Sequence, residues 1–370
     1  MESLVCSFCG KRYSVKDPVW RCECGHPLDL EFEASWNPQG TPDQAHGIWR
    51  YREALPLKNS GNIVSLGEGF TPILEVTVSG RPVLLKLEFL SPTGSFKDRG
   101  ASVLISKAQE LGVKKVVEDS SGNAGCAIAA YSARAGIECH IYIPESTSPG
   151  KVLQIKAYGA EVFRVPGNRT EVARAAWEAS KKAYYASHIW NPFFLQGTKT
   201  LAYEIFEQLN FQIPDTIIFP VGNGTLLIGA YLGFSELLNQ HLIERLPRLV
   251  AAQAEACAPL YLAYSRKGGE IPEVIPQSTI AEGIVIPQPP RGKQVLEILR
   301  KTGGMVLQVK EREILEAMRI LSSRGILAEP TSAVALAAFL KKPEEWGEKV
   351  LIPLTGNGLK TIEQYQKIIF

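Results

Sequence analysis

The chain has 370 residues, of which 45% are apolar, and its 40 basic side chains nearly balance its 38 acidic ones. This length suffices for a large core and for two lobes, and the balanced charge argues against nucleic acid or an acidic membrane surface as a partner. No apolar run is long enough to span a bilayer, and the first ten residues lack the basic and apolar regions of a secretory signal. We therefore expect a cytoplasmic protein that does not act on membranes.

Four of the seven cysteines lie within the first 24 residues, which predicts a metal site rather than a disulfide framework. Cys6 and Cys9 form one pair, Cys22 and Cys24 form the other, and a glycine follows each pair. Four thiolates at this spacing suit structural, tetrahedral zinc. The second pair is unusually close, so His26 is an alternative ligand. The other interpretations are a ribbon that has lost its metal and simple free thiols.

Residues 35–62 show no periodicity and are interpreted as a linker packed on the main body. From about residue 63 onward, apolar strands alternate with helices, which is typical of an α/β protein with mostly parallel sheets. Strands are predicted at residues 81–89, 114–120, 139–144, 161–167, 216–221, 248–254 and 349–356. Helices are predicted at residues 96–112, 124–136, 151–159, 170–183 and 226–238.

The first loop that is a candidate for a reactive site is the stretch that precedes the helix at 96–112. Pro92 and Gly94 form a turn, Ser95 is a natural helix cap, and Lys97 falls in the first helical turn. The helix dipole and the neighbouring Phe96 disfavour a charged amine there, and a neutral amine attacks aldehydes. The alternative is a solvent-facing lysine screened by the acidic residue after it, Asp98.

A second loop, Ser120, Ser121, Gly122 and Asn123, joins the strand at 114–120 to the next helix. Its hydroxyls and N–H groups converge at the positive end of the helix dipole, which suits a carboxylate. The alternative is ordinary helix capping by Ser121 or Asn123.

A third loop, Gly222, Asn223, Gly224 and Thr225, lies directly between a strand and a helix. The unpaired N–H groups of such a helix start form an anion cradle, most often for phosphate. The spacing is neither that of a dinucleotide fingerprint nor that of a nucleotide-binding P-loop. The alternative is a glycine-rich turn without a ligand. A reactive lysine, a phosphate cradle and a carboxylate loop together predict pyridoxal phosphate and an amino-acid substrate.

Six motifs carry a resemblance to a known family. They are "PTGSFKDRG", "SSGNAG", "PVGNGT", "IAEGI", "EPTSA" and "LTGNGLK". In this order they resemble the threonine synthase family of fold type II pyridoxal-phosphate enzymes, over residues 65–365. The N-terminal cysteine segment also resembles a ribbon found on some members.

The resemblance implies a two-lobed tryptophan-synthase-β-like fold and a role for each motif residue. Lys97 would bond the cofactor aldehyde and move protons. The residues implied to contact the cofactor are Lys97, Asn123, Gly222, Asn223, Gly224, Thr225, Glu282, Gly283 and Thr355, of which Thr355 would face the pyridine nitrogen. Those implied to bind the substrate carboxylate are Ser120, Ser121, Gly122 and Asn123. The implied parts are a zinc-ribbon-like segment at 1–34, a large cofactor-binding lobe at 35–92 and 187–370, and a small mobile lobe at 93–186, in a chain that forms a homodimer.

The resemblance also implies a reaction, which converts O-phosphohomoserine and water to threonine and phosphate. Where the family has an arginine for the leaving phosphate, around an Asn-Pro step, this chain has Phe193 and Phe194. His188, Lys199 or Arg169 would have to compensate. One alternative is β-elimination or β-replacement on another amino acid, as in a serine/threonine-type ammonia-lyase. The other is a non-catalytic pyridoxal-phosphate-binding protein that uses the zinc ribbon as an interaction module.

Overall fold

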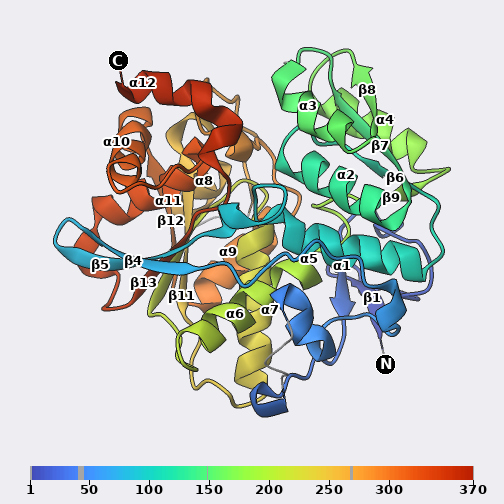
Figure 1. Ribbon diagram of the computed structural model, residues 1–370, viewed down its shortest axis with the longest axis horizontal. Helices are drawn as coiled ribbons and strands as arrows, with labels where there is room; N and C mark the ends of the chain where they lie inside the picture. The colour runs from blue at the N-terminus through green and yellow to red at the C-terminus, as the bar shows by residue number, and fades with distance from the viewer. Residues whose placement is uncertain (1, 41–45, 148, 267–269, 370) are drawn as a thin grey trace. The chain divides into compact units, whose positions relative to one another are not determined.

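The computed structural model describes residues 2–40, 46–147, 149–266 and 270–369 (Figure 1). It divides into two compact units, each with its own sheets and core. Unit 1 comprises Met1–Phe70, Ser91–Thr93 and Lys97–Thr200, and unit 2 comprises Thr71–Leu90, Gly94–Phe96 and Leu201–Phe370. The lobe boundaries expected from the sequence stay a prediction.

Unit 1 begins with a small antiparallel sheet in which β1 (Ser3–Cys6) lies between β2 (Arg12–Tyr13) and β3 (Leu28–Glu31). Leu4 and Leu28 of this sheet are fully buried in the core of the unit. The predicted linker after it contains short 3-10 helices, of which the longest is Gly47–Ala54, and its residues 41–45 lie outside the described residues.

The main sheet of unit 1 is parallel, with strand order β8-β7-β6-β9. Its strands are β6 (Lys115–Glu118), β7 (Glu138–Pro144), β8 (Glu161–Val165) and β9 (Tyr184–Tyr185). The helices of the unit are α1 (Lys97–Glu110), α2 (Asn123–Ala135), α3 (Pro149–Ala157), α4 (Arg169–Ala179) and α5 (Pro192–Thr198). Helix α2 packs against β6 and β7, and α1 packs against α2 and α5 (Figure 1). The polar loop ends of β6 and of the strands beside it therefore lie along one edge of the sheet.

Unit 2 contains a six-stranded sheet in the order β12-β11-β10-β13-β5-β4, parallel except for the edge strand β4. The strands are β4 (Ile73–Val78), β5 (Arg81–Lys86), β10 (Thr216–Pro220), β11 (Arg248–Ala254), β12 (Met305–Val309) and β13 (Val350–Pro353). The helices of this part are α6 (Thr200–Gln208), α7 (Thr225–Asn239), α8 (Pro259–Ser265), α9 (Gly292–Lys301), α10 (Glu311–Ser322), α11 (Pro330–Lys341) and α12 (Gln366–Ile369).

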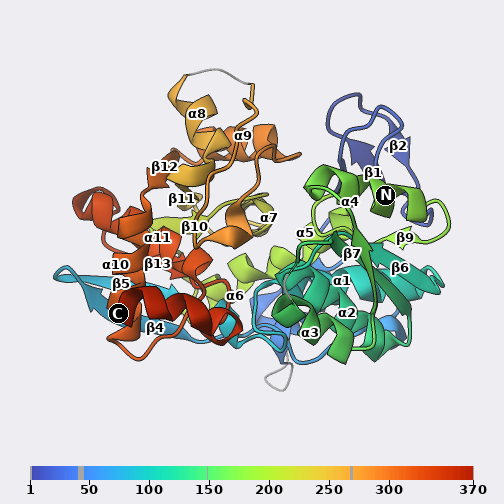
Figure 2. The ribbon, with the colours of Figure 1, turned by 90° about the horizontal axis from the view of Figure 1, so that it is seen from above.

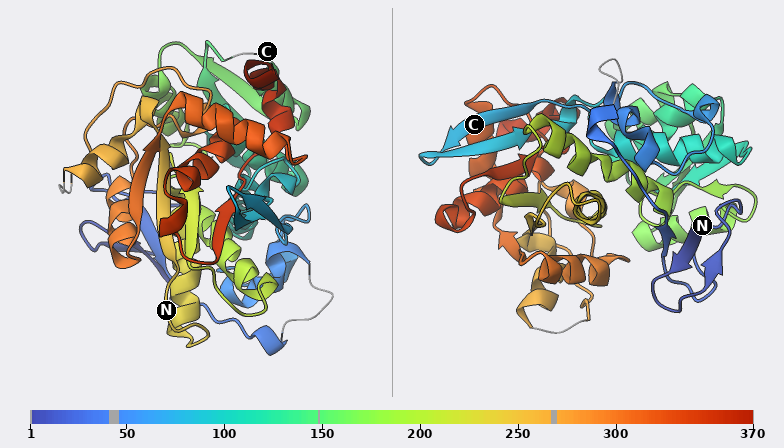
Figure 3. Two further views of the ribbon diagram at one scale, coloured as in Figure 1. Left: turned by 90° about the vertical axis from the view of Figure 1, so that its left-hand side faces the viewer. Right: turned by 90° about the horizontal axis from the view of Figure 1, so that it is seen from below.

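Helices cover both faces of the sheet in unit 2. Helix α11 packs on β10, β11, β12 and β13, with α10 beside it, while α7 and α9 pack on β11 from the other side (Figure 2). The left view of Figure 3 shows the orange-red helices lying along the sheet. Because both faces are covered, β13 is buried at every position, and its sequence "VLIP" is continuously apolar rather than alternating.

The structure confirms each predicted strand and helix to within a few residues, and it adds elements that the sequence did not predict. The additions include the edge strands β4 and β12, the two-residue strand β9, and helices α5, α6 and α8 to α12. Within the described ranges, every helix is too short or too polar to cross a membrane.

Candidate active site

Lys97 is the first residue of α1, as the sequence predicts, and the turn before it is held by the next residue. The carboxylate of Asp98 is buried and accepts hydrogen bonds from Thr93 N (2.7 Å) and Thr93 Oγ1 (2.6 Å). The prediction that Ser95 caps the helix is wrong, because Ser95 Oγ is buried and has no hydrogen-bond partner among the described residues. Asp98 therefore fixes the place from which the lysine side chain extends.

The surroundings of Lys97 favour a neutral amine. Its side chain is partly exposed, yet burial of the amine lowers the pKa of Lys97 to about 7. The Glu118 carboxylate opposes this shift, and the charge of Arg169 adds a smaller lowering of the pKa. The Phe194 ring lies 5.6 Å from Lys97 Nζ. Taking the amine out of water is the dominant cause, since burial disfavours the charged form. At neutral pH a substantial fraction of the amine is unprotonated and nucleophilic.

The predicted carboxylate loop lies in the same unit as Lys97. It connects β6 to α2, whose N-cap is Gly122, with no side-chain cap. The N-cap position of α2 is therefore Gly122 and not Ser121 or Asn123, the two residues considered from the sequence. A Cβ on Gly125 would lie 2.0 Å from Ser120 O, so only glycine lets the loop fold this closely onto the first turn of the helix.

A buried acidic side chain, Glu118, ends β6 just before this loop. Glu118 is 0% exposed and His188 4% exposed, and Glu118 Oε1 lies 2.6 Å from His188 Nδ1. The second oxygen, Oε2, is buried without a hydrogen-bond partner in the described part of the chain. Burial, followed by the neighbouring Asp119, raises the pKa of Glu118, and burial lowers the pKa of His188. Sequence reasoning missed Glu118, although a charged residue at the carboxyl end of an apolar parallel strand is a usable signal.

The Asn-Pro step is apolar in the structure, as its sequence indicates. Asn191 caps α5 by accepting from Phe193 N (3.1 Å), and Phe193 and Phe194 are both buried. Of the three residues considered as replacements for a phosphate-binding arginine, Lys199 is fully buried, with Nζ 5.2 Å from the Phe32 ring, and His188 is bonded to Glu118. Arg169, at the start of α4, is exposed, and its charge lowers the pKa of both Lys97 and His188.

In unit 2, the predicted phosphate loop follows β10 and ends at Thr225, the first residue of α7. A Cβ on Gly222 would lie 2.9 Å from Ile286 Cγ1 and 3.0 Å from Ile284 Cα. Gly224 has a φ of +79°, which favours glycine. Asn223 Oδ1 is buried with no partner among the described residues, a sign that something outside the chain completes this loop.

Three further motifs of unit 2 pack together behind that loop. Gly283 lies in the turn Glu282–Ile284, and a Cβ there would be 2.9 Å from Thr331 Oγ1. Thr355 is buried, with Oγ1 3.1 Å from Ser332 Oγ, and Ser332 Oγ also accepts from Gly356 N. The sequences "IAEGI", "EPTSA" and "LTGNG" thus form one cluster, and Ser332 is a member that sequence reasoning did not single out.

The four N-terminal cysteines meet at one point of unit 1. All four Sγ atoms lie within 4.8 Å of one another, with Cys6–Cys24 and Cys9–Cys22 distances of 3.5 Å. Sulfur atoms bound to one tetrahedral zinc are about 3.8 Å apart. His26 Nδ1 lies 3.5 Å from Cys24 Sγ and its ring stacks on Phe8, so His26 contacts a cysteine and is not needed as a fourth ligand.

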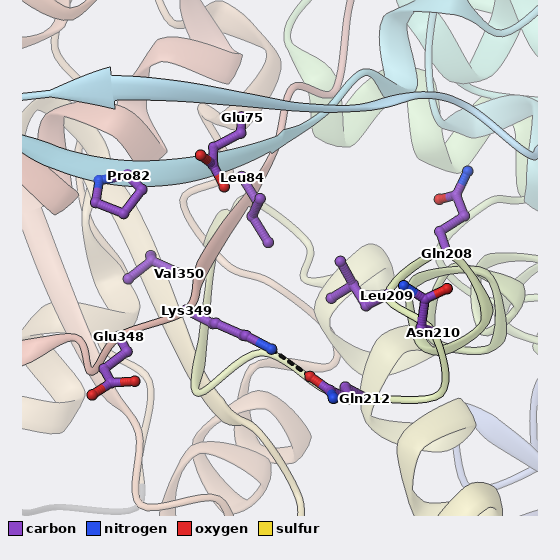
Figure 4. Close-up of a pocket in the computed structure, with 10 residues that line it drawn as sticks. All are labelled: Glu75, Pro82, Leu84, Gln208, Leu209, Asn210, Gln212, Glu348, Lys349 and Val350. Atoms are coloured by element: carbon purple, nitrogen blue, oxygen red, sulfur yellow. Dashed lines mark hydrogen bonds between the residues drawn. The ribbon is translucent and has the colours of Figure 1, made fainter.

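A cavity of about 300 Å³ in unit 2 is separate from these motifs (Figure 4). It is lined by Glu75, Pro82, Leu84, Gln208, Leu209, Asn210, Gln212, Glu348, Lys349 and Val350. Lys349 Nζ donates to Gln212 Oε1 across it. Val350 begins β13, so the cavity lies at the amino ends of the parallel strands, whereas ligands of such sheets bind at the carboxyl ends.

The structure thus brings the predicted residues together in two sets. Unit 1 holds Lys97, Ser120, Ser121, Gly122 and Asn123, together with the cysteines. Unit 2 holds Gly222, Asn223, Gly224, Thr225, Glu282, Gly283 and Thr355. The assignment of these residues to cofactor and substrate stays a prediction.

Comparisons with known proteins agree on one family. Residues 64–356 match the family described as "Pyridoxal-phosphate dependent enzyme". The chain is 37% identical to a threonine synthase from Methanocaldococcus jannaschii, over 96% of this chain and 92% of the relative, and 34% identical to one from Methanosarcina acetivorans, over 97% and 92%.

Solved structures show the same fold. A maize serine racemase matches with a TM-score of 0.69 and 26% identity, over 80% of this chain and 92% of that one. A serine racemase from Dictyostelium discoideum matches with a TM-score of 0.66 and 29% identity, over 78% and 92%.

Proposed function

Because the chain belongs to the pyridoxal-phosphate-dependent enzymes, and within them to the threonine synthase family, we propose that it converts O-phosphohomoserine and water to threonine and phosphate. It is a pyridoxal-phosphate-dependent lyase of the α/β class. The identity of 37% over 96% of the chain is the observation that carries the proposed reaction.

The residues present fit the cofactor. The phosphate loop packs so closely on Ile284, Ile286 and Val295 that a Cβ on Gly222 or Gly224 would collide with them. The amide oxygen of Asn223 in this loop is buried without a protein partner in the described residues. Lys97 offers an amine with a pKa of about 7. We assign the aldehyde of the cofactor to Lys97, its phosphate to Gly222, Asn223, Gly224 and Thr225, and its ring to Asn123, Glu282, Gly283 and Thr355.

The cofactor supplies an electron-withdrawing ring that stabilises negative charge on the substrate carbon next to the amino group. Lys97 Nζ then takes the proton from that carbon and later returns one, which requires the neutral amine that its surroundings favour. Thr355 offers the ring nitrogen a neutral hydroxyl rather than a carboxylate, and Ser332 holds that hydroxyl in place. The Ser120–Asn123 loop binds the substrate carboxylate at the N-terminus of α2, where the helix dipole favours an anion.

Arg169 is the residue that we assign to the leaving phosphate. It is exposed, and its charge acts on both Lys97 and His188, while the other two candidate replacements are buried. A guanidinium binds phosphate through two parallel hydrogen bonds, which Phe193 and Phe194 do not provide.

The decisive experiment incubates the holoenzyme with O-phosphohomoserine and measures phosphate and threonine together. We expect equal amounts of both. In Arg169→Gln the KM for this substrate should rise about tenfold, since one charge-assisted contact to phosphate is lost. The KM of Arg169→Lys should lie between that of the wild type and that of Arg169→Gln. Arg174→Gln, on the same helix, serves as the matched control and should behave like the wild type.

The contrary result would be ammonia and a 2-oxo acid from serine or threonine with no phosphate release from O-phosphohomoserine. It would place the chain with the β-eliminating enzymes and would leave the family assignment intact.

We also propose that Cys6, Cys9, Cys22 and Cys24 hold one structural zinc ion, because their sulfur atoms already lie at distances close to those of a tetrahedral site. Purified protein should contain about one zinc per chain by metal analysis. Cys22→Ser should lose most of the metal and melt at a lower temperature, whereas Cys257→Ser, a buried cysteine of unit 2, should keep the metal. Equal metal content in both variants would contradict the assignment.

A further inference from the structure

One buried acidic group in unit 1 has no place in the mechanism above. Glu118 is fully buried at the end of β6, two residues before the loop that begins at Ser120, and one of its oxygens has no hydrogen-bond partner in the described residues. A buried carboxyl group with one unpaired oxygen costs stability, which suggests that Glu118 has a chemical role. The side chains around Glu118 indicate what that role is.

Four side chains from four parts of unit 1 form a connected group around Glu118. Glu118 Oε1 lies 2.6 Å from His188 Nδ1, the His188 and Phe194 rings are 6.0 Å apart, and the Phe194 ring is 5.6 Å from Lys97 Nζ. Phe194 is fully buried, so the group is shielded by an apolar ring. Charges in such surroundings interact strongly, because water screens them poorly.

We propose that Glu118 and His188 form a dyad that controls the charge of the nitrogen at Lys97. An ionised Glu118 favours the protonated nitrogen, and a protonated Glu118 favours the neutral one. The coupling is electrostatic, in a site that the buried ring of Phe194 shields from water. Glu118 and His188 act through Lys97 and are positioning residues; the proposal rests on the proposed function only in taking Lys97 as the cofactor-bearing lysine.

His188 is suited to both states of Glu118. When Glu118 is ionised, His188 Nδ1–H donates to Oε1; when Glu118 is protonated, its O–H donates to Nδ1 of the other neutral tautomer. His188 stays neutral in either case because burial, with the charges of Lys97 and Arg169, lowers its pKa. Glu118 and His188 are therefore hydrogen-bonded in both protonation states of Glu118.

The opposite pKa shifts of Glu118 and Lys97 support this coupling. Burial raises the pKa of Glu118 and lowers that of Lys97 to about 7, so the two pKa values approach one another and the two titrations become interdependent. The other titratable or charged groups that act on this cluster are Asp119, Tyr185, Arg169 and Cys139. Asp119 accepts a hydrogen bond from Tyr185 (2.6 Å), so its charge has its own partner.

The test titrates the visible absorption of the bound cofactor with pH in the holoenzyme and follows kcat and KM over the same range. An ionised Glu118 raises the pKa of the nitrogen at Lys97, as it does for the amine. In Glu118→Gln the midpoint should therefore move to lower pH, by about one unit. We expect kcat to fall about tenfold because a Lys97 amine of lower pKa is a weaker base, with KM changed less than about twofold. Glu118→Asp should restore the midpoint.

Two further variants keep the result interpretable if Glu118→Gln does not fold. His188→Asn keeps a group that can donate to or accept from Glu118 and should retain the wild-type profile, whereas His188→Leu should shift it as Glu118→Gln does. Glu138→Gln is the matched control, since Glu138 is also paired with a histidine, His140 (2.7 Å), but is exposed on β7. It should leave the profile unchanged.

An unchanged titration midpoint in folded Glu118→Gln, or in His188→Leu, would overturn the dyad. Failure of the proposed function looks different: borohydride reduction would then not fix the cofactor on Lys97 in the wild-type protein.

Discussion

Replacing Lys97 with alanine is expected to lower kcat/KM by at least about a thousandfold, because alanine neither bonds the cofactor aldehyde nor moves a proton. Borohydride reduction of the wild-type holoenzyme, followed by peptide mapping, should place the cofactor on the peptide that contains Lys97. Lys97→Arg should be as inactive as Lys97→Ala, because a guanidinium stays protonated.

Lys97→Ala also has a pH-dependent effect on the stability of the cofactor-free protein. The pKa of Lys97 is lowered from 10.5 to about 7, so the folded state disfavours the charged amine. The cost of folding with this residue is therefore full below pH 7 and fades as the pH rises from about 7 to 10.5. Lys97→Ala should be more stable than the wild type in acid, and this gain should shrink in alkali.

Chemical denaturation at several pH values measures that difference. Lys156→Ala, at an exposed position of α3, is the matched control and should show no such trend. A stability difference for Lys97→Ala that does not change with pH would mean that the amine is hydrated in the folded protein.

Gly197→Ala is the substitution with the largest expected effect on folding. Gly197 lies on α5 where this helix crosses α1, and a Cβ there would be 2.0 Å from Arg99 O and 2.7 Å from Gly100 Cα. Both obstacles are backbone atoms of a buried helix, so no side chain can rotate away. Because α5 and α1 would have to separate, we expect a loss of about 3 kcal/mol in the free energy of unfolding.

Activity should fall together with stability in this variant, because α5 carries Phe194 against Lys97. Denaturant titration of Gly197→Ala beside Gly150→Ala gives the comparison. Gly150 is an exposed position of α3, and a Cβ there would meet no described atom within 4 Å, so alanine should be neutral or stabilising by about 0.5 kcal/mol. Equal unfolding midpoints for the two variants would show that the helices do not approach this closely.

The fold class and the motif residues were predictable because they depend on local features. Apolar strands such as "TIIFP" alternate with helical periodicity, and that alternation indicates parallel sheets wherever the strands lie. The loop of Gly222 and Gly224 stands out because glycine is required where backbone or side chains approach closely or φ is positive. The cysteine spacing in the first 24 residues is local in the same sense.

Several elements were not predicted, although some left a signal. Helix α10 carries apolar residues at Ile314, Ala317, Met318 and Leu321, which is helical spacing. Strand β9 has two residues and pairs with β6 only because the chain returns to that edge, so no local pattern marks it. The capping role predicted for Ser95 failed because Asp98, three residues later, holds the turn through Thr93 instead.

By itself, the sequence determined the α/β class, the polar loops between strands and helices, and the lysine at the start of a helix, since each is a property of a few adjacent residues. Tertiary structure alone decided which distant side chains act on that lysine: the charge of Glu118 comes from β6, that of Arg169 from α4, and the Phe194 ring from a helix after the main sheet of unit 1. The reason is physical. The pKa of an amine depends on which groups surround it and on how much water they exclude, and both are set by packing between segments that the sequence does not bring together.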